Sequence, residues 1–131
     1  MGAAKEARSF GNVMEEAWGF SQAVRVGDTI YVSGQTAAAD DFTAIGGDDM
    51  AAQMRAAYAS VARVLAMFGA GMSDVVDEVL FVTDMTAAVT YGQTVRGEVY
   101  GGSFEVASTL IGVAALGSPD LMIEIKCVAQ V

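Results

Sequence analysis

A predicted β-hairpin between residues 18 and 35 is the feature that most constrains how this chain folds. Two apolar runs rich in β-branched residues, 20–25 and 29–33, flank the sequence Val26-Gly27-Asp28. A glycine at the centre of such a turn supplies the positive φ that hairpin turns need. The second run ends in Ser33-Gly34-Gln35, where the missing Cβ of the glycine leaves room for a ligand to approach the backbone. The hairpin therefore predicts a sheet with a small polar notch at one end.

A long amphipathic helix is predicted after the loop of residues 36–47. Asp48 is placed to cap this helix, and Asp49 lies in its first turn. Apolar residues from position 50 to position 68 then recur at intervals of three and four, which predicts a helix of about 20 residues. Glycines at 69 and 71 mark its end.

The remaining chain alternates between strand and helix patterns. Residues 8–10 form a possible edge strand, and residues 75–84 are apolar on both faces, which is typical of a central strand. Thr86 caps a second predicted helix over residues 87–100, followed by strands at residues 104–113 and 121–131. This order predicts one α+β domain over residues 1–131, a single mixed β-sheet with two helices packed on one face.

The composition predicts an oligomer. Hydrophobic residues make up 53% of the 131 residues and charged residues only 18%. A domain of this size has little interior relative to its surface, so this much apolar side chain is difficult to bury in a monomer. We expect the sheet face without helices to be covered by other copies of the chain.

The location and cofactor content are predicted largely from what the sequence lacks. No run reaches the roughly 18 apolar residues of a membrane span, and the first ten residues lack the apolar core of a secretion signal. Cys127 is the single cysteine, so we expect no disulfide, no zinc cluster and no metal site. These features favour a cytoplasmic protein without a cofactor and without a membrane partner.

The charge pattern argues against a nucleic-acid partner. The net charge is −9, and the seven basic residues are scattered, with no two adjacent. Nucleic-acid binding draws most of its affinity from clustered Lys and Arg side chains that neutralise phosphates. We therefore expect a small-molecule ligand instead.

Glu124 is the strongest acid–base candidate in a chain that contains no histidine. It stands between Ile123 and Ile125, so strand alternation points its side chain away from both. Burial without a cationic partner would raise its pKa. The alternative is that Glu124 pairs with a base across a subunit interface or is solvated at an edge.

Four segments resemble the Rid family of reactive intermediate deaminases, also called the YjgF or endoribonuclease L-PSP family. The likeness runs from about residue 18 to the C-terminus, and the segments are Phe20-Ser21-Gln22-Ala23-Val24, Ile30-Tyr31-Val32-Ser33-Gly34-Gln35, Phe81-Val82-Thr83-Asp84-Met85 and Ile123-Glu124-Ile125-Lys126-Cys127-Val128-Ala129. The resemblance implies a chorismate-mutase-like fold and a homotrimer whose sheets line a central barrel, with clefts at the subunit interfaces. It also implies hydrolysis of 2-imino acids to 2-keto acids and ammonia.

The resemblance assigns roles to several residues of the cleft. Ser33 matches a cleft serine, and Glu124 matches the glutamate that positions the attacking water. The helix position Gly92 also falls at a family cleft position. If the chain is a hydrolase, we expect Ser33, Ser108 and the backbone amides near Gly34 and Thr109 to hold the substrate, and Phe20 and Leu110 to form apolar walls. Phe20 stands where deaminating members have tyrosine, and Gly92 where many have asparagine.

Ser108 is the largest departure from the family pattern. Active deaminases carry an arginine at this position, where it grips the substrate carboxylate. A guanidinium offers a planar, charged, bidentate grip that a hydroxyl does not reproduce. We therefore expect the chain not to be a standard 2-imino-acid deaminase, and a less acidic or larger substrate would suit the site. Arg96 on the second predicted helix is an alternative cation, although its simpler interpretation is an ordinary solvated side chain.

Several other polar residues can be explained by structural roles alone. Ser33 and Ser108 are small hydroxyls at strand ends, with no base predicted beside them to activate a nucleophile. Cys127 is interpreted as a buried apolar filler, and Glu105 as facing away from the cleft because it has the opposite strand parity to Ser108.

Two functions from different classes remain open. The first is a hydrolase or deaminase acting on an imine, an enamine or a related reactive metabolite, with Glu124 orienting water. The second is a non-catalytic trimer that binds or senses a metabolite in the same cleft. Ribonuclease action, a label that some relatives carry, is not expected because histidine is absent and the net charge is −9.

Overall fold

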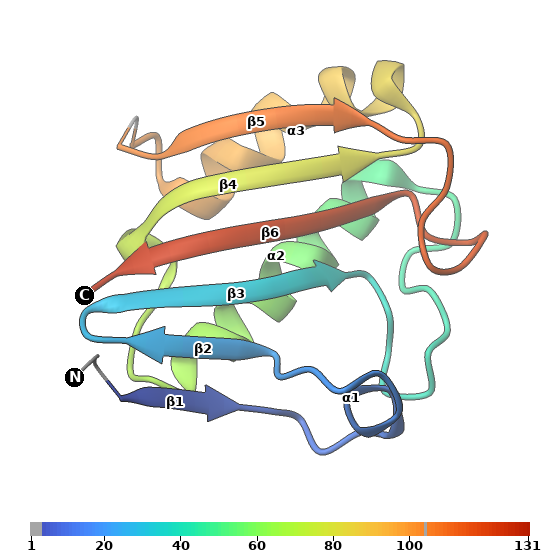
Figure 1. Cartoon of the computed structure of the whole chain (residues 1–131). Helices are drawn as coiled ribbons and strands as arrows, with labels where there is room; N and C mark the ends of the chain where they lie inside the picture. The colour runs from blue at the N-terminus through green and yellow to red at the C-terminus, as the bar shows by residue number, and fades with distance from the viewer. Residues whose placement is uncertain (1–3, 104) are drawn as a thin grey trace.

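A six-stranded mixed sheet forms the centre of the molecule in a computed structural model, which describes residues 4–103 and 105–131 (Figure 1). The strand order is β1-β2-β3-β6-β4-β5, and all pairs are antiparallel except β4 with β5. The elements in chain order are β1 (Lys5–Arg8), α1 (Val13–Trp18), β2 (Ala23–Val26), β3 (Thr29–Thr36), α2 (Met50–Ala66), the 3₁₀ turn η1 (Met72–Asp74), β4 (Val75–Val82), α3 (Met85–Tyr100), β5 (Ala107–Gly112) and β6 (Ile123–Gln130).

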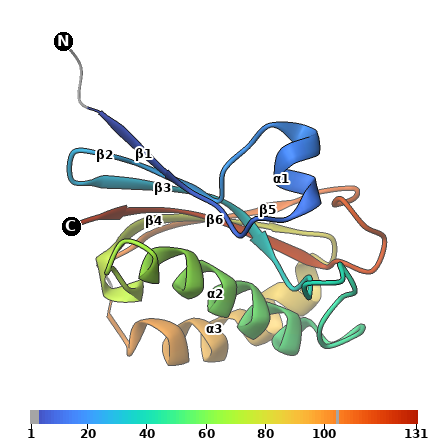
Figure 2. The same cartoon turned by 90° about the horizontal axis from the view of Figure 1, so that it is seen from below.

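The two long helices cover one face of the sheet. Figure 2 shows α2 and α3 side by side below the strands, whereas α1 lies on the other side of the sheet near its edge. We call the covered side the helix face and the opposite side the open face. The predicted fold class, an α+β domain with two helices on one face of a mixed sheet, is confirmed.

The core lies between the helix face and the two long helices. Strand residues contribute every second side chain to it, as the alternation of buried and exposed positions along β3, β4 and β6 requires. Its fully buried side chains include Ile30, Val32, Val82, Ile123 and Ile125 from the strands and Met54, Val61, Val64, Leu65 and Val95 from the helices.

The β2–β3 hairpin forms as predicted, but its first strand is shorter. Val26 pairs with Thr29 across a two-residue turn, and Gly27 has a φ of +59°. The strand begins at Ala23 and not at Phe20, because residues 20–22 follow a turn at the end of α1. Phe20 therefore lies on a connecting segment and not on the sheet.

The notch at Ser33-Gly34-Gln35 lies within a strand and does not end one. Val32 pairs with Cys127 and Gln35 with Ile125, so β3 has one residue more than β6 between these two pairs. Such a β-bulge bends the strand and changes which face the following side chains occupy. Consequently Gln35 is buried on the same side as Val32, although the two positions differ in parity.

Both long helices begin with an aspartate cap one position or more away from the predicted residue. Asp49, not Asp48, accepts the amide of Ala52 at the start of α2, and Asp84, not Thr86, accepts the amide of Ala87 at the start of α3. In each case the cap carboxylate stands three residues before the amide it accepts, which is the usual N-cap spacing. Helix α2 has 17 residues, fewer than the predicted length of about 20.

The N-terminal part differs most from the prediction. The edge strand is β1 at Lys5–Arg8, earlier than residues 8–10, and it is followed by a short helix, α1, that was not predicted. Asn12 and Glu15 form a capping box that starts this helix, and Gly19 ends it at a φ of +71°.

Two further observations concern the later strands and membranes. β5 begins at Ala107, whereas the prediction began at Phe104, a residue outside the described part of the chain. None of the helices in the described residues is long and apolar enough to cross a membrane.

Candidate functional site

Sheet alternation separates the predicted site residues onto two faces. Glu124 pairs with Thr36 and Phe81 on the open face, and Thr109 shares this face through its pairing with Val79. Ser108 and Leu110 pair with Glu78 and Leu80 and therefore lie on the helix face. Within one chain, Glu124 and Ser108 are on opposite sides of the sheet.

Glu124 lies against the backbone of Gly34 on the open face. A Cβ added to Gly34 would stand 2.7 Å from Cδ and 2.9 Å from Cγ of Glu124, and still closer to Oε2. Glycine is therefore required for this carboxylate to occupy its position. Burial raises the pKa of Glu124, partly opposed by the positive charge of Lys126, and Glu124 has no salt-bridge partner among the described residues.

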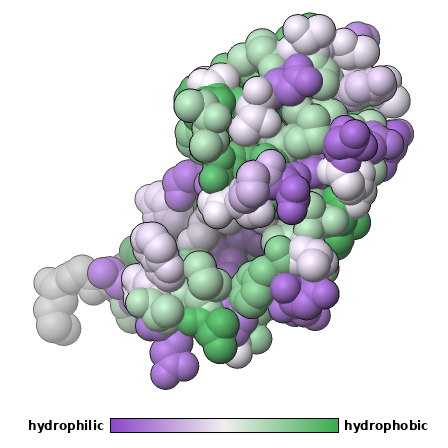
Figure 3. All heavy atoms as spheres, turned by 90° about the vertical axis from the view of Figure 1, so that its right-hand side faces the viewer, coloured by the Kyte–Doolittle hydropathy of each residue, from purple (hydrophilic) through white to green (hydrophobic). Residues whose placement is uncertain are grey.

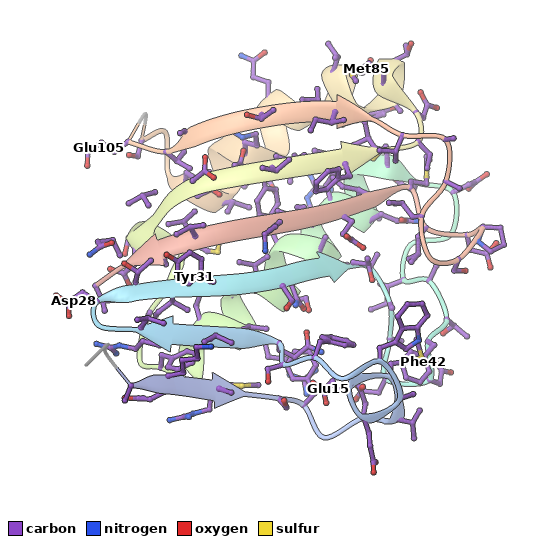
Figure 4. The ribbon with its side chains drawn as sticks, in the orientation of Figure 1. Glu15, Asp28, Tyr31, Phe42, Met85 and Glu105 are labelled. Atoms are coloured by element: carbon purple, nitrogen blue, oxygen red, sulfur yellow. The ribbon has the colours of Figure 1, made fainter. Side chains whose placement is uncertain are left out.

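A first cavity lies next to this pair, at the end of the sheet where β3 ends. Its volume is about 390 Å³, and its lining includes Phe20 and Gly34. Figure 3 views this end of the molecule and shows a recess with hydrophilic surface between more hydrophobic groups. Phe42 and Glu15, labelled in Figure 4, lie near this end together with α1. Ser33 stands beside the cavity but has a structural role, because its hydroxyl donates to the carbonyl of Ser21 at 2.7 Å.

A series of hydrogen-bonded polar side chains, Ser60, Gln35 and Gln22, contributes to the wall of the first cavity. Ser60 donates to Gln35 at 2.6 Å, Gln35 donates to Gln22 at 2.8 Å, and Gln22 donates to Glu15 at 2.9 Å. Glu15 also accepts the backbone amides of residues 10, 11 and 12. This hydrogen-bonded series connects α2, β3 and α1, and no local pattern in the sequence predicts it.

A second cavity of about 480 Å³ lies on the helix face, between α3 and β5. Three of the predicted site residues, Gly92, Ser108 and Leu110, line it. The predicted residues thus fall into two groups on one chain: Phe20 and Gly34 at the first cavity with Glu124 beside them, and the other three at the second.

A buried glutamate, Glu78, organises the wall of the second cavity. Its side chain is fully buried, and its carboxylate accepts four hydrogen bonds. The donors are the Tyr58 hydroxyl (2.7 Å), the Tyr100 hydroxyl (2.7 Å), Arg96 Nε (2.7 Å) and the Ser108 hydroxyl (2.5 Å). Burial first, and the contact with Glu78 second, raise the pKa of both tyrosines, so these phenols stay protonated and donate.

Arg96 is therefore not the ordinary solvated residue that its sequence context favoured. Its side chain is 32% exposed, and it forms a salt bridge with the fully buried carboxylate of Glu78. The structure also places a carboxylate beside Ser108, where no base was expected. This carboxylate is shared between the Ser108 hydroxyl and the guanidinium of Arg96.

The family is decided by a match over most of the chain. The family model for endoribonuclease L-PSP matches residues 11–131. The chain belongs to the endoribonuclease L-PSP family. This confirms the identification as a Rid or YjgF family member, since these names occur among its relatives.

Three relatives show how close this L-PSP family chain is to known members. RutC family protein YjgH of Escherichia coli (strain K12) is 31% identical over 112 residues, which covers 86% of this chain and 82% of YjgH. The crystal structure of Rv2704 from Mycobacterium tuberculosis, a YjgF/YER057c/UK114 family member, is 33% identical with a TM-score of 0.84, covering 98% of this chain and 100% of Rv2704. YyfB of Yersinia pestis, a Rid family protein of unknown function, is 30% identical with a TM-score of 0.72, covering 97% and 98% of the two chains.

Other polar groups of this L-PSP family chain lie away from both cavities or are inert. Cys127 is a buried filler as expected, and burial, with the negative charges of Glu78 and Asp77, raises the pKa of its thiol to about 12. Glu105 lies at the outer end of β5 (Figure 4). Within residues 4–103 and 105–131, no three His, Cys, Asp or Glu side chains are grouped as a metal site would require.

Proposed function

We propose that this chain is a hydrolase that deaminates an imine, an enamine or a related reactive small molecule. The observation that carries the proposal is the position of Glu124, a half-buried carboxylate that has no salt-bridge partner among the described residues and lies against Gly34, a lining residue of the first cavity. Perturbed carboxylates in such positions are typical of general acids and bases. Membership of the L-PSP family supports the same assignment.

The proposed reaction needs one group that moves a proton. Glu124 takes a proton from water as its oxygen attacks the imine carbon, and the carbon–nitrogen double bond becomes a single bond. The same carboxyl group returns that proton to nitrogen, which gives a carbinolamine. It then carries the hydroxyl proton to the amino nitrogen, so that the carbonyl forms and ammonia leaves. The overall change is imine plus water giving carbonyl plus ammonia, without an oxidant or reductant.

The site is proposed to be completed between subunits of a homotrimer. On one chain the two groups of site residues are separated by the sheet, with Glu124 on the open face and Ser108 on the helix face. The open face carries large exposed or half-exposed apolar side chains, including Tyr31 and Ile111, which would be covered in an assembly (Figure 4 shows Tyr31 facing the viewer). A cleft between copies would bring Glu124 of one chain toward the second cavity of another.

Ammonia release from freshly generated imines tests the proposal. The imines of 2-aminobutanoate, leucine and phenylalanine are formed with an amino-acid oxidase, and the protein is added at the same time. Glu124→Gln keeps the shape of the side chain but does not accept the proton, so we expect a loss of about 100-fold or more. Glu98→Gln is the matched control, because it removes one exposed carboxylate from α3.

The outcome separates the two open functions. Acceleration by the wild type that depends on Glu124 and not on Glu98 supports the hydrolase. If wild type never exceeds spontaneous hydrolysis with any of the three imines, the chain does not deaminate 2-imino acids, and the result favours the metabolite-binding alternative.

A further inference from the structure

We propose that the first cavity binds a free α-amino acid with an aromatic side chain, and that Arg63, Asp40 and Ser60 hold its zwitterionic head. All three residues line the cavity, whereas Glu124 is not among its lining residues in the described part of the chain. The inference therefore goes beyond the proposed function, and it does not depend on turnover at Glu124.

The hydrogen-bonded series on the cavity wall has a fixed direction, because it ends at a carboxylate. Glu15 already accepts three backbone amides, and an ionised carboxylate only accepts, so the Gln22 amide nitrogen must face it. The amide oxygen of Gln22 is then turned to Gln35, and the amide oxygen of Gln35 is turned to Ser60. The single hydroxyl proton of Ser60 is thereby used. Its oxygen presents only lone pairs to the cavity, and it requires a ligand group that donates.

Arg63 offers the complementary charge one helical turn away from Ser60. Residues three positions apart are neighbours on the surface of a helix such as α2. The guanidinium carbon of Arg63 lies 3.9 Å from the centroid of the Phe10 ring, which restricts where the guanidinium can lie. No hydrogen bond from this guanidinium to another described residue is formed, so its N–H groups are available to a ligand carboxylate.

The ion pair of Arg63 with Asp40 is open to a ligand that carries both charges. The two side chains are 54% and 96% exposed, and Nη1 of Arg63 lies 3.5 Å from Oδ1 of Asp40, which is longer than an ordinary hydrogen bond. Exposed pairs of this kind contribute little to stability. A zwitterion replaces the one loose contact with two closer ones, its carboxylate on Arg63 and its ammonium between Asp40 and Ser60.

The remaining lining is suited to an aromatic side chain. Phe20, Phe42 and Met14 line the cavity and are each partly exposed, so they offer apolar surface to a ligand. Phe42 has a φ of +68°, a left-handed conformation that a bulky residue rarely adopts and that is concentrated at ligand sites. The backbone thus holds a phenyl ring at the cavity in spite of local strain. The volume of about 390 Å³ lies within the range of small-molecule sites.

Three stable probes separate the parts of the ligand without any turnover. L-Phenylalanine carries both charges, 3-phenylpropanoate lacks the ammonium, and 2-phenylethylamine lacks the carboxylate. Dissociation constants are measured by calorimetry. Wild type is expected to bind L-phenylalanine about 10-fold or more tightly than either single-charge probe, because each of them loses a charged hydrogen bond. L-Alanine, which keeps the head and lacks the ring, is also expected to bind at least about 10-fold more weakly.

Two variants remove one charge each. Arg63→Gln is expected to weaken L-phenylalanine and 3-phenylpropanoate but not 2-phenylethylamine, and Asp40→Asn to weaken L-phenylalanine and 2-phenylethylamine but not 3-phenylpropanoate. Both side chains are more than half exposed, so neither variant leaves a buried charge without a partner. Arg55→Gln is the matched control on the same helix, because Arg55 pairs with Glu98 outside this cavity. Asp28→Asn in the hairpin turn is the control for the aspartate.

The results separate this inference from the proposed hydrolase. If the two variants lose the preference for L-phenylalanine while wild type hydrolyses none of the imines, the inference stands and the proposed deamination fails. If imines are hydrolysed but wild type binds the three probes alike, or binds none of them, the inference is overturned and the hydrolase stands. Binding of L-phenylalanine that is lost in Glu124→Gln and kept in Arg63→Gln places the ligand elsewhere and also overturns the inference.

Discussion

Gly34 and Glu124 occupy positions that are mutually dependent, since the carboxylate of Glu124 lies where a side chain on residue 34 would begin. The backbone of Gly34 does not have a positive φ, so glycine is required here for space and not for conformation. A glycine in a strand interior otherwise weakens a sheet. Its presence at this point is explained by the carboxylate that it admits.

Gly34→Ala is expected to displace Glu124 and to reduce imine hydrolysis by at least about 10-fold, on the scale of a misplaced general base. Stability should change by less than about 1 kcal/mol, because the end of a flexible side chain can move away. Ammonia release and thermal unfolding measure the two effects. Gly117→Ala, where a Cβ meets no atom within 4 Å, is the control. In a Glu124→Gln background Gly34→Ala should cause no further loss, and an additive loss would contradict the coupling.

Tyr58→Phe is expected to destabilise the fold by about 1–3 kcal/mol, because it removes one donor from a fully buried carboxylate. Tyr31→Phe is the matched control, since Tyr31 is half-exposed on the open face and its hydroxyl makes no hydrogen bond within the described residues. The control should shift stability by no more than about 0.5 kcal/mol. Urea unfolding of both variants measures the difference, and equal effects would mean that Glu78 does not depend on this donor.

The carboxylate of Glu15 should make the stability of the fold depend on acid pH. Burial alone would raise its pKa, but the amides of Phe10 and Asn12, then Gln22 and Gly11, outweigh burial and lower the pKa from 4.5. A lowered folded-state pKa contributes stability above the unfolded-state pKa, and this contribution is lost as the pH falls through the folded value. Glu15→Gln should therefore be less stable than wild type at pH 7 by about 1–3 kcal/mol. Urea unfolding between pH 7 and pH 3 should show the gap narrowing below about pH 4.5, and a constant gap would contradict this assignment.

Gly27→Ala is expected to destabilise the chain by about 1–2 kcal/mol through backbone strain alone. Gly27 has a φ of +59°, and a Cβ there would meet no atom within 4 Å, so no steric clash contributes. Gly71→Ala is the control, because that glycine is equally open but does not have a positive φ. Chemical denaturation of the two variants distinguishes them. If both variants lose similar amounts of unfolding free energy, the positive φ of the turn does not explain the effect.

Local patterns were sufficient to predict much of the fold. The hairpin, both long helices and the central strand were predicted because a glycine turn, a period of three and four, and an apolar run are each read within a few residues. The same alternation placed Glu124 opposite to Ile123 and Ile125, and both isoleucines are buried whereas Glu124 is not. Helix α1 was missed because it has only six residues, and its start depends on a capping box.

The Glu78 cluster could not be predicted in the same way. Its partners Tyr58, Arg96, Tyr100 and Ser108 lie on two helices and another strand, between 18 and 30 residues away in the sequence. Each of them has an ordinary local explanation, as a core aromatic, a helix surface residue or a strand hydroxyl. A polar residue inside an otherwise apolar central strand was the one available signal, because such a residue needs partners if it is buried.

The extra residue of β3 between Val32 and Gln35 limits which deletions the site can tolerate. Removing one residue there would restore a regular ladder between β3 and β6, in which the backbone hydrogen bonds continue without interruption. With Gly34 removed, Gln35 would stand two positions after Val32 and would keep its pairing with Ile125 on the helix face. The open backbone of Gly34, against which the carboxylate of Glu124 lies, would be lost. The most regular form of this sheet is thus one without the site, and selection for stability alone would tend to erase it.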